Sequence, residues 1–273
     1  MSLDLDALSK FLEKISREAG DITLQYFRKN VQSSYKDNGK GIVTQADLAS
    51  EKHLLSQIKK EYPDHHIITE ESGLNASKNL ETPYLWIIDP LDGTTNFSQG
   101  SRYYCISIAF CEKTKTGTKV LAAGVYAPAY DDYYSAQLGK GSTCNSQKIQ
   151  VKEADSFEEG YYATGFSYNS KENLKKIIKS IEAIKLSGKA ATVRVYGAAA
   201  LDISMTAHGI CNGFWELNLS SWDMAAGALL IEEAGGIVTN FKGEAFDPLV
   251  HTDIVGGPAS IHSKLLQVIK ENF

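Results

Sequence analysis

The sequence predicts a layered α+β protein that forms a single unit. Its 273 residues, 43% hydrophobic and 22% charged, suit a globular chain long enough to bury a full core. Helix and strand patterns come in mixed order, whereas a doubly wound parallel sheet needs strict alternation. The sequence has no internal repeat or obvious linker. The weakest continuity lies near residues 139–141, so we expect an N-terminal half of about 1–140 and a C-terminal half of about 141–273.

The first third of the chain predicts two helices and two strands. Residues 1–20 carry an apolar stripe at helical spacing. Thr44 begins a second amphipathic helix, which Pro63 ends. The apolar runs HHIITEE and YLWIID, at residues 65–71 and 84–89, indicate short strands that each end on carboxylates.

The rest of the chain predicts a β-rich stretch and then four helices with two strands. Between residues 104 and 137, three runs alternate with turns, so we expect antiparallel strands. Glycine closes two of the later helices. In chain order, we expect helices at 171–185, 197–209 and 220–236, strands at 236–240 and 253–257, and a final helix from Ser260.

Composition limits the class of partner and the compartment. The net charge of −5, without long like-charged blocks, argues against nucleic-acid or membrane-surface binding, because both favour basic patches. The four cysteines form no CxxC pair and lie among apolar neighbours, so we expect reduced core residues. No segment approaches the roughly 20 apolar residues that span a bilayer, and the N-terminus does not resemble a signal peptide. We therefore expect a cytoplasmic protein.

Two carboxylates crowd the turn Asp89-Pro90-Leu91-Asp92. Pro90 cannot donate a hydrogen bond, so we expect the strand to stop there and the turn to aim both carboxylates to one side. An ordinary Asp-rich turn is one interpretation, and a cation site is the other. A helix-loop-helix calcium site is excluded because the twelfth position from Asp89 is Gly100, where that loop needs glutamate.

The residues after this turn favour phosphate chemistry. Gly93 and Thr94 expose backbone N–H groups, which can cradle a phosphate as helix N-termini do. Cation ligands beside a phosphate cradle are what metal-assisted phosphoryl hydrolysis needs.

Other carboxylates occupy comparable junctions, and each also has a purely structural interpretation. Glu70 and Glu71 end a predicted strand. Asp47, three residues after Thr44, matches a capping box, and Asp223 in the first turn of a helix complements the helix dipole. The sequence alone does not bring these residues into one cluster.

Two long motifs identify a resemblance. The block WIIDPLDGTTNF, with SSWDMAAGALLIEEAGG further on, resembles the Asp-Pro-x-Asp-Gly-Thr/Ser and Trp-Asp-x-Ala-Ala-Gly motifs of the inositol monophosphatase family. The resemblance extends through TEES, VTQAD and GAAALD to nearly the whole chain. It implies a layered αβαβα sandwich of the inositol monophosphatase / fructose-1,6-bisphosphatase type, a homodimer, and a Mg²⁺-dependent, lithium-sensitive phosphatase.

The resemblance also implies a ligand set for two or three Mg²⁺ ions per subunit. Glu70, Asp89 and the carbonyl of Leu91 correspond to ligands of the first ion. Asp89, Asp92 and Asp223 correspond to ligands of the second, and a third, weaker ion is expected near Glu70. Carboxylate oxygens are the hard ligands that Mg²⁺ prefers.

By the same resemblance, the catalytic residues are Glu70 and Thr94, assisted by Asp47; they would position the attacking water and take its proton. The N–H groups of Gly93 and Thr94 would hold phosphate oxygens. Catalysis of this kind is positioning and electrostatics, without a covalent phosphoenzyme.

Local differences within the family favour a polyol or sugar phosphate. Residues Thr95, Asn96 and Phe97 resemble those of the inositol monophosphatase and fructose-1,6-bisphosphatase branches. Histidinol-phosphatases and 3′(2′),5′-bisphosphate nucleotidases typically have a lysine at the position that corresponds to Thr95. Myo-inositol 1-phosphate is the leading candidate and fructose 1,6-bisphosphate the second.

A second set of residues is similar to the family's substrate pocket. Glu216, seven before Asp223, corresponds to a glutamate that accepts hydrogen bonds from sugar-alcohol hydroxyls, and Gly197, Ala198 and Ala199 correspond to a backbone wall. A solvated strand-end charge and tight helix packing are the alternative interpretations.

Three further expectations concern the edge of the site and the class of protein. Arg194 could meet a second phosphate, and the polar loop around Lys36 could close over the metals, although a solvated surface explains both. Some bacterial family members have a role in transcription complexes, so a regulatory protein is the non-enzymatic alternative. Because Glu70, Asp89, Asp92 and Asp223 are all present, an enzyme is favoured.

Overall fold

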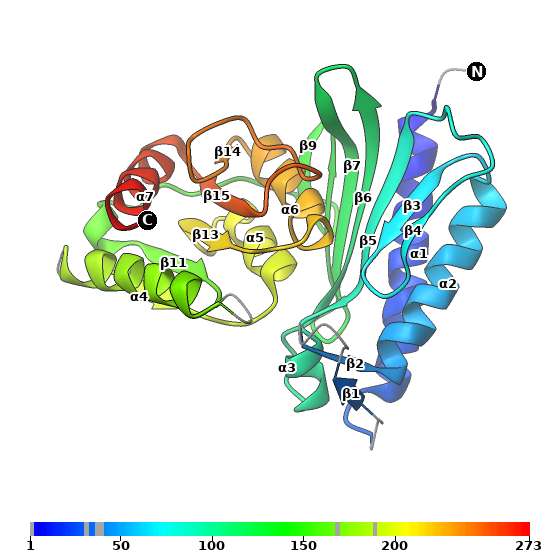
Figure 1. Cartoon of the computed structure of the whole chain (residues 1–273), viewed down its shortest axis with the longest axis horizontal. Coiled ribbons are helices and arrows are strands. Elements are labelled where there is room, and N and C mark those ends of the chain that lie inside the picture. The colour runs from blue at the N-terminus through cyan, green and yellow to red at the C-terminus, as the bar shows by residue number, and fades with distance from the viewer. Residues whose placement is uncertain (1–2, 30–32, 36–40, 167–169, 188–189) are drawn as a thin grey trace.

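Helices and sheets alternate in five layers (Figure 1). The computed structural model describes residues 3–29, 33–35, 41–166, 170–187 and 190–273. The predicted αβαβα sandwich is confirmed. The layers are helices α1 (Leu5–Tyr26) and α2 (Gln45–Glu61), an eight-stranded sheet, helices α5 (Ala199–Ala207) and α6 (Ser221–Glu233), a five-stranded sheet, and helices α4 (Lys171–Leu186) and α7 (Ala259–Asn272).

The eight-stranded sheet has the order β10-β9-β8-β7-β6-β5-β3-β4 and is antiparallel except for the pair β3 and β5. The three antiparallel strands expected between residues 104 and 137 are confirmed as β6, β7 and β8. The strands are β3 (His66–Thr69), β4 (Gly73–Asn75), β5 (Tyr84–Asp92), β6 (Cys105–Thr114), β7 (Gly117–Ala127), β8 (Asp132–Gln137), β9 (Gly141–Cys144) and β10 (Gln147–Ile149).

The five-stranded sheet has the order β12-β11-β13-β15-β14. Its outer face packs on α4 and α7 through a core that includes Ile177, Ile184, Trp215 and Leu265. The strands are β11 (Tyr161–Thr164), β12 (Thr192–Arg194), β13 (Gly213–Leu217), β14 (Ile237–Thr239) and β15 (Asp253–Gly257). Three short elements and one 3-10 turn complete the chain: β1 (Ser33–Tyr35), β2 (Ile42–Thr44), α3 (Thr94–Ser98) and η1 (Phe157–Glu159). Lys36 lies outside the described residues.

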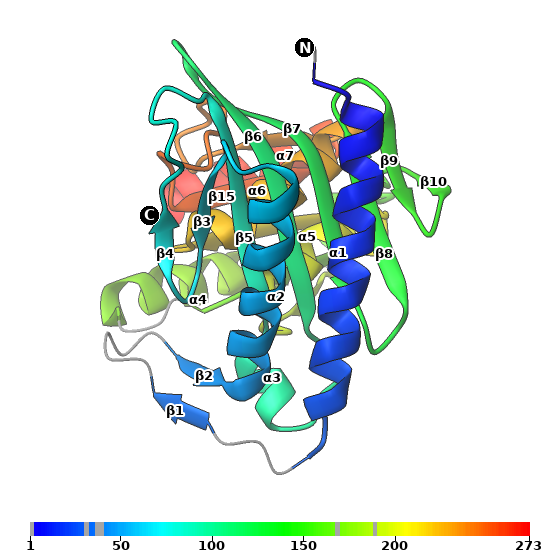
Figure 2. The same ribbon diagram turned by 90° about the vertical axis from the view of Figure 1, so that its right-hand side faces the viewer.

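Strand β5 is buried on both faces, and its alternation decides where its acidic end points. Trp86 and Ile88 pack on the side of α1 and α2, which lie side by side across the sheet (Figure 2). Leu85 and Ile87 pack on the other side, against α5 and α6. Because side chains alternate along a strand, Asp89 follows Ile87 onto the side of α6.

The prediction that Pro90 ends this strand is wrong. β5 continues to Asp92, and its register with β6 slips: Asp89 faces Ser107, whereas Asp92 faces Cys105. Three steps along β5 therefore oppose two along β6, which is a bulge. A bulge tolerates a proline because the extra residue needs no ladder hydrogen bond. It also returns Asp92 to the face of Asp89, although an odd spacing of three would otherwise separate them.

Two further expectations meet the structure here. All four cysteines are buried and free, as predicted. Over the described ranges, none of the helices is long and apolar enough to cross a membrane.

Helix α1 lies close against the sheet at Gly20. A Cβ added there would lie 2.4 Å from a ring carbon of Tyr126 and 2.9 Å from Cγ of Pro128. The Tyr126 ring is held in place, because its hydroxyl donates to Asp131 Oδ1 at 3.0 Å and Arg17 lies over its face.

We predict that Gly20→Ala destabilises the protein. Helix propensity alone would make alanine about 1 kcal/mol better than glycine. Overpacking opposes this and costs about 1–3 kcal/mol, so the net change should be a loss. Urea unfolding measures it, with Gln25→Ala at an exposed position of the same helix as the control. A gain in stability for Gly20→Ala would contradict the packing described here.

Candidate active site

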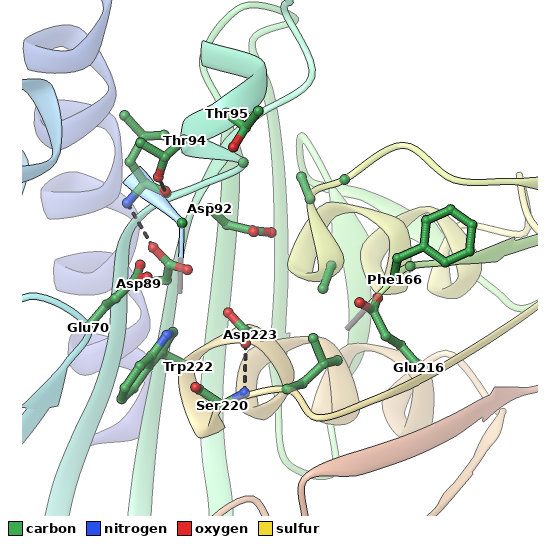
Figure 3. A pocket seen from close by; sticks show the side chains of 18 of the residues that line it. Glu70, Asp89, Asp92, Thr94, Thr95, Phe166, Glu216, Ser220, Trp222 and Asp223 are labelled. Carbon is green, nitrogen blue, oxygen red and sulfur yellow. Dashed lines mark hydrogen bonds between the residues drawn. The ribbon is translucent and has the colours of Figure 1, made fainter. Parts of the chain in front are cut away.

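A pocket opens between the two large sheets, where β5 and β13 end and α5 and α6 begin (Figure 3). The residues predicted to be catalytic, metal-binding or substrate-binding all line it except Asp47, which lies behind Thr94. Five of the lining residues carry a carboxylate, and in the described parts of the chain none of them is Lys, Arg or His. The pocket is lined by residues 41, 42, 70, 89, 91–95, 165, 166, 197–199, 216, 218–220, 222 and 223.

Three carboxylates converge at the floor of this pocket. Asp89 and Asp92 from β5 and Asp223 from α6 each offer one oxygen, and these oxygens lie within 4.8 Å of one another. The sheet alternation and the bulge supply the first two, and the first turn of α6 supplies the third. Residues 131 positions apart in the sequence are thereby brought to one point (223 − 92 = 131).

Asp89 is 1% exposed and is held by its own turn, in which the N–H of Leu91 donates to Oδ1 at 2.9 Å. Burial, followed by the charges of Glu70, Asp92 and Asp223, raises the pKa of Asp89 well above its ordinary value. Ionised together without a cation, these groups repel one another in a desolvated site.

Asp92 is anchored by the start of α5. The N–H of Ala200 donates to Asp92 Oδ2 at 2.8 Å, and the thiol of Cys105 lies 3.7 Å from the same oxygen. Burial raises the pKa of Asp92 to about 7, although the N–H of Ala200 stabilises the charged form.

Asp223 has both of the roles expected from its sequence position, because it stabilises the start of a helix and also belongs to the acidic cluster. Its Oδ2 accepts the N–H of Ser220 at 2.7 Å, which caps α6 (Figure 3). The same carboxyl group still contributes an oxygen to the acidic cluster.

Glu70 lies beside the cluster but outside its three-residue core. Its N–H donates to the carbonyl of Ile88 at 3.3 Å, which fixes the end of β3 against the end of β5. The side chain lines the pocket next to Asp89 (Figure 3). Glu71 does not line the pocket.

Thr94 and Asp47 form a hydrogen-bonded pair at the pocket wall. Thr94 Oγ1 lies 2.9 Å from Asp47 Oδ1 and 3.1 Å from the carbonyl oxygen of Leu91. The other oxygen of Asp47 accepts the N–H of Thr44 at 2.9 Å, so the predicted capping box is also present. Asp47 is fully buried, and burial raises its pKa to about 6.

Only glycine fits at position 93. Its φ of +85° is left-handed, and a Cβ there would lie 3.0 Å from both Ala198 Cβ and the carbonyl oxygen of Tyr103. Gly93 precedes α3, whose first N–H groups have no acceptor within the helix. The turn can therefore present backbone donors to the pocket.

Glu216 forms the opposite wall (Figure 3). It is 7% exposed, which contradicts the interpretation as a solvated strand-end charge. Its carboxylate lies so close to Gly165 that a Cβ there would be 2.2 Å from Oε1. Burial, and then the charges of Asp202 and Asp223, raise the pKa of Glu216 well above its ordinary value. Gly197, Ala198 and Ala199 join it at the start of α5.

The sequence patterns assigned no site role to Asn96, Phe166 and Trp222. Asn96 Nδ2 donates to the carbonyls of Tyr103 at 2.9 Å and Tyr196 at 2.7 Å, which ties the turn after β5 to the segment before α5. Phe166 and Trp222 line the pocket (Figure 3). Asn96 and Trp222 lie inside the two motifs quoted from the sequence, which is the available signal for them, but no local pattern marks Phe166.

Arg194 does not line the pocket; its guanidinium lies over the ring of Tyr161.

The donor set suits a hard divalent cation. Asp89, Asp92 and Asp223 offer closely spaced oxygens. Burial, followed by the charges of Glu70, Asp92 and Asp223, raises the pKa of Asp89, and a bound cation would relieve this repulsion. All three carboxylates are oriented by backbone N–H donors, as oxygen ligands of metals commonly are.

Comparisons with known proteins show which family this chain resembles along its length. A profile of the inositol monophosphatase family matches residues 4–272. The Nus factor SuhB of Pseudomonas aeruginosa is 36% identical over 260 residues, which cover 94% of this chain and 93% of that protein. The chloroplastic phosphatase IMPL1 of Arabidopsis thaliana is 33% identical over 264 residues, which cover 96% of this chain and 70% of that protein.

Solved structures superpose along almost the whole length. The extragenic suppressor protein suhB of Bartonella henselae matches with a TM-score of 0.89 at 30% identity, covering 98% of this chain and 100% of that one. The IMPase of Thermotoga maritima matches with a TM-score of 0.85 at 30% identity, covering 97% of each chain. This chain belongs to the inositol monophosphatase family.

Proposed function

We propose that the protein is a Mg²⁺-dependent phosphomonoesterase that hydrolyses a small polyol or sugar phosphate. The observation that carries the proposal is the convergence of Asp89, Asp92 and Asp223 within 4.8 Å in one pocket. Membership of a family named for a phosphatase supports it. So does the phosphatase name of the Arabidopsis relative.

The proposed ligands divide into two groups. Glu70, Asp89 and the carbonyl of Leu91 would hold one ion, and Asp89, Asp92 and Asp223 a second, with a third near Glu70. When bound, such ions polarise phosphoryl oxygens and lower the pKa of a water molecule.

The remaining roles belong to groups of the chain itself. Because the hydroxyl of Thr94 can donate to Asp47, its lone pair is left to accept a hydrogen bond from the attacking water. Glu70, on the same side of the pocket, would take the proton from that water. The N–H groups of Gly93 and Thr94 would hold the phosphate oxygens.

The opposite wall supports a polyol as the alcohol part of the ester. Glu216 presents a buried carboxylate, which is a strong acceptor for hydroxyl groups. The cavity, of about 260 Å³, suits a small substrate. Myo-inositol 1-phosphate is the leading substrate. Fructose 1,6-bisphosphate is second, because its other phosphate meets no cationic side chain among the described lining residues.

A role in a transcription complex is the second candidate function. It is favoured by one observation: a relative that is 36% identical is named a Nus factor. The complete acidic set favours catalysis, and both roles can coexist. A homodimer, lithium sensitivity and a cytoplasmic location stay predictions.

We predict that phosphate release from myo-inositol 1-phosphate requires Mg²⁺ and depends on Asp89. Asp89→Asn should lower kcat/KM by at least about 100-fold, the scale seen when one electrostatic group is removed from an active site. The same change at exposed Asp64 is the matched control. Undiminished turnover by a folded, metal-loaded Asp89→Asn protein would remove the catalytic assignment.

We predict that the acidic cluster destabilises the metal-free protein as pH rises. The pKa of Asp92 is about 7 in the folded protein, whereas its ordinary value, expected in the unfolded chain, is 3.8, so folding takes up a proton between these values. The free energy of unfolding therefore falls across this window. Asp92 does not lower the free energy of unfolding below about pH 4, and it lowers this free energy by its full amount above about pH 7.

Asp92→Asn should remove this penalty. In a chelator, the variant should match the wild type near pH 4 and exceed it in stability near pH 8, as measured by urea unfolding. Mg²⁺ should then stabilise the wild type more than the variant. A stability difference that does not change with pH would contradict the prediction.

We predict that Glu216 recognises the alcohol rather than the phosphate. Glu216→Gln should raise KM for myo-inositol 1-phosphate about tenfold or more, the scale of one hydrogen bond to a charged group. Hydrolysis of p-nitrophenyl phosphate, which has no hydroxyl to bind, should change little. Parallel assays with fructose 1,6-bisphosphate, histidinol phosphate and a 3′,5′-bisphosphorylated nucleotide complete the test. Preference for the nucleotide would overturn the assignment of Glu216.

A further inference from the structure

Helix α2 turns a polar face toward the ends of the strands that form the site. Asp47, Ser50 and Glu51 are spaced as i, i+3 and i+4, so they share this face, and they are at most 6% exposed. Ser50 Oγ donates to the carbonyl of Pro90 at 2.8 Å, beside the bulge of β5. Buried polar side chains almost always form hydrogen bonds, because an unpaired polar group is costly away from water. On this face, each of the three side chains has a partner in a segment that carries proposed site residues.

Glu51 contacts both neighbours of Glu70. Its Oε2 accepts the hydroxyl of Thr69 at 2.7 Å and the backbone N–H of Glu71 at 3.0 Å. Thr69 is the last residue of β3, and the hydrogen bond from the Glu70 N–H to the carbonyl of Ile88 is the last backbone contact of this segment with β5 that the described structure gives. The direction of the Glu70 side chain therefore depends on how its two neighbours are held. The carboxylate of Glu51 holds the side chain of Thr69 on one side and the peptide N–H of Glu71 on the other.

We propose that Glu51 is a positioning residue that orients Glu70 toward the metal side of the pocket. The inference rests on the proposed function, because Glu70 matters only if it binds the ion or its water. Glu51 does not line the pocket, so it acts through Glu70. Partners that orient a ligand from behind typically change metal affinity or activity 10–100-fold when they are removed.

The simplest alternative is that Glu51 only stabilises the turn between β3 and β4. Removal of a side chain with that structural role would lower the free energy of unfolding but leave the Mg²⁺ affinity of the folded protein unchanged. Metal affinity, measured without substrate, separates the two.

The experiment titrates the full-length protein with Mg²⁺ by calorimetry and by fluorescence, for which Trp222 in the pocket wall is a reporter. Glu51→Ala should weaken Mg²⁺ binding about 10–100-fold. Glu51→Gln keeps an acceptor oxygen and should recover most of the affinity. Glu61→Ala, at the exposed end of the same helix, is the matched control and should bind like the wild type.

A double-mutant cycle tests whether Glu51 acts through Glu70. In the background Glu70→Gln, the further change Glu51→Ala should have little additional effect on Mg²⁺ affinity. Thr69→Val, which removes one of the two donors, provides a second measurement if Glu51→Ala does not fold. It should weaken Mg²⁺ binding in the same direction.

Three outcomes would overturn the proposal: a folded Glu51→Ala with wild-type affinity, full additivity in the cycle, or wild-type affinity of Thr69→Val. Failure of the proposed function appears separately. A wild-type protein that binds Mg²⁺ but releases no phosphate would contradict the phosphatase assignment, while the cycle would still decide the role of Glu51.

Discussion

The constraint on which this structure depends is the repulsion among carboxylates that lie side by side at the floor of one pocket. One oxygen from each of Asp89, Asp92 and Asp223 lies within 4.8 Å of the other two, and burial with the neighbouring charges makes the ionised form of Asp89 unfavourable. Left to relax, such side chains would rotate away from one another. Each is instead held by a backbone N–H, from Leu91, Ala200 or Ser220. The surrounding fold thus keeps together what electrostatics would separate.

The layered architecture brings the three carboxylates to one point. Alternation along β5 directs Asp89 toward α6, and the bulge at Pro90 directs Asp92 the same way. Helix α6, in the layer between the two sheets, then brings its first turn, with Asp223, to the same point. A central strand buried on both faces makes this geometry difficult to distort, because a one-residue slip would exchange its two apolar faces. Stability of the sheet and geometry of the site are therefore set by the same register.

Much of this arrangement could be predicted, and the part that could not has a physical reason. The helix periods, the capping box at Thr44 and the carboxylates at strand ends are local patterns, and the structure contains them. The route by which Asp92 reaches the side of Asp89 was not predictable, because proline signals a strand end and only the pairing with β6 reveals a bulge. Glu51 was missed because a glutamate in a polar helix has no local signature of burial. Its partners at Thr69 and Glu71 are defined only by tertiary packing.

The sequence offered a choice between capping and function for Asp47 and Asp223, and the geometry shows why the choice was unnecessary. A carboxylate has two oxygens, and a cap uses one of them. Asp47 accepts Thr44 with Oδ2 and Thr94 with Oδ1, and Asp223 caps α6 while contributing to the acidic cluster. The capping hydrogen bond also fixes the side-chain rotamer. The remaining oxygen of the carboxylate therefore points in a defined direction without any further contact. A helix start that needs an acidic residue is therefore a favourable place to hold a cation ligand, and an interpretation as a cap does not argue against one as a site.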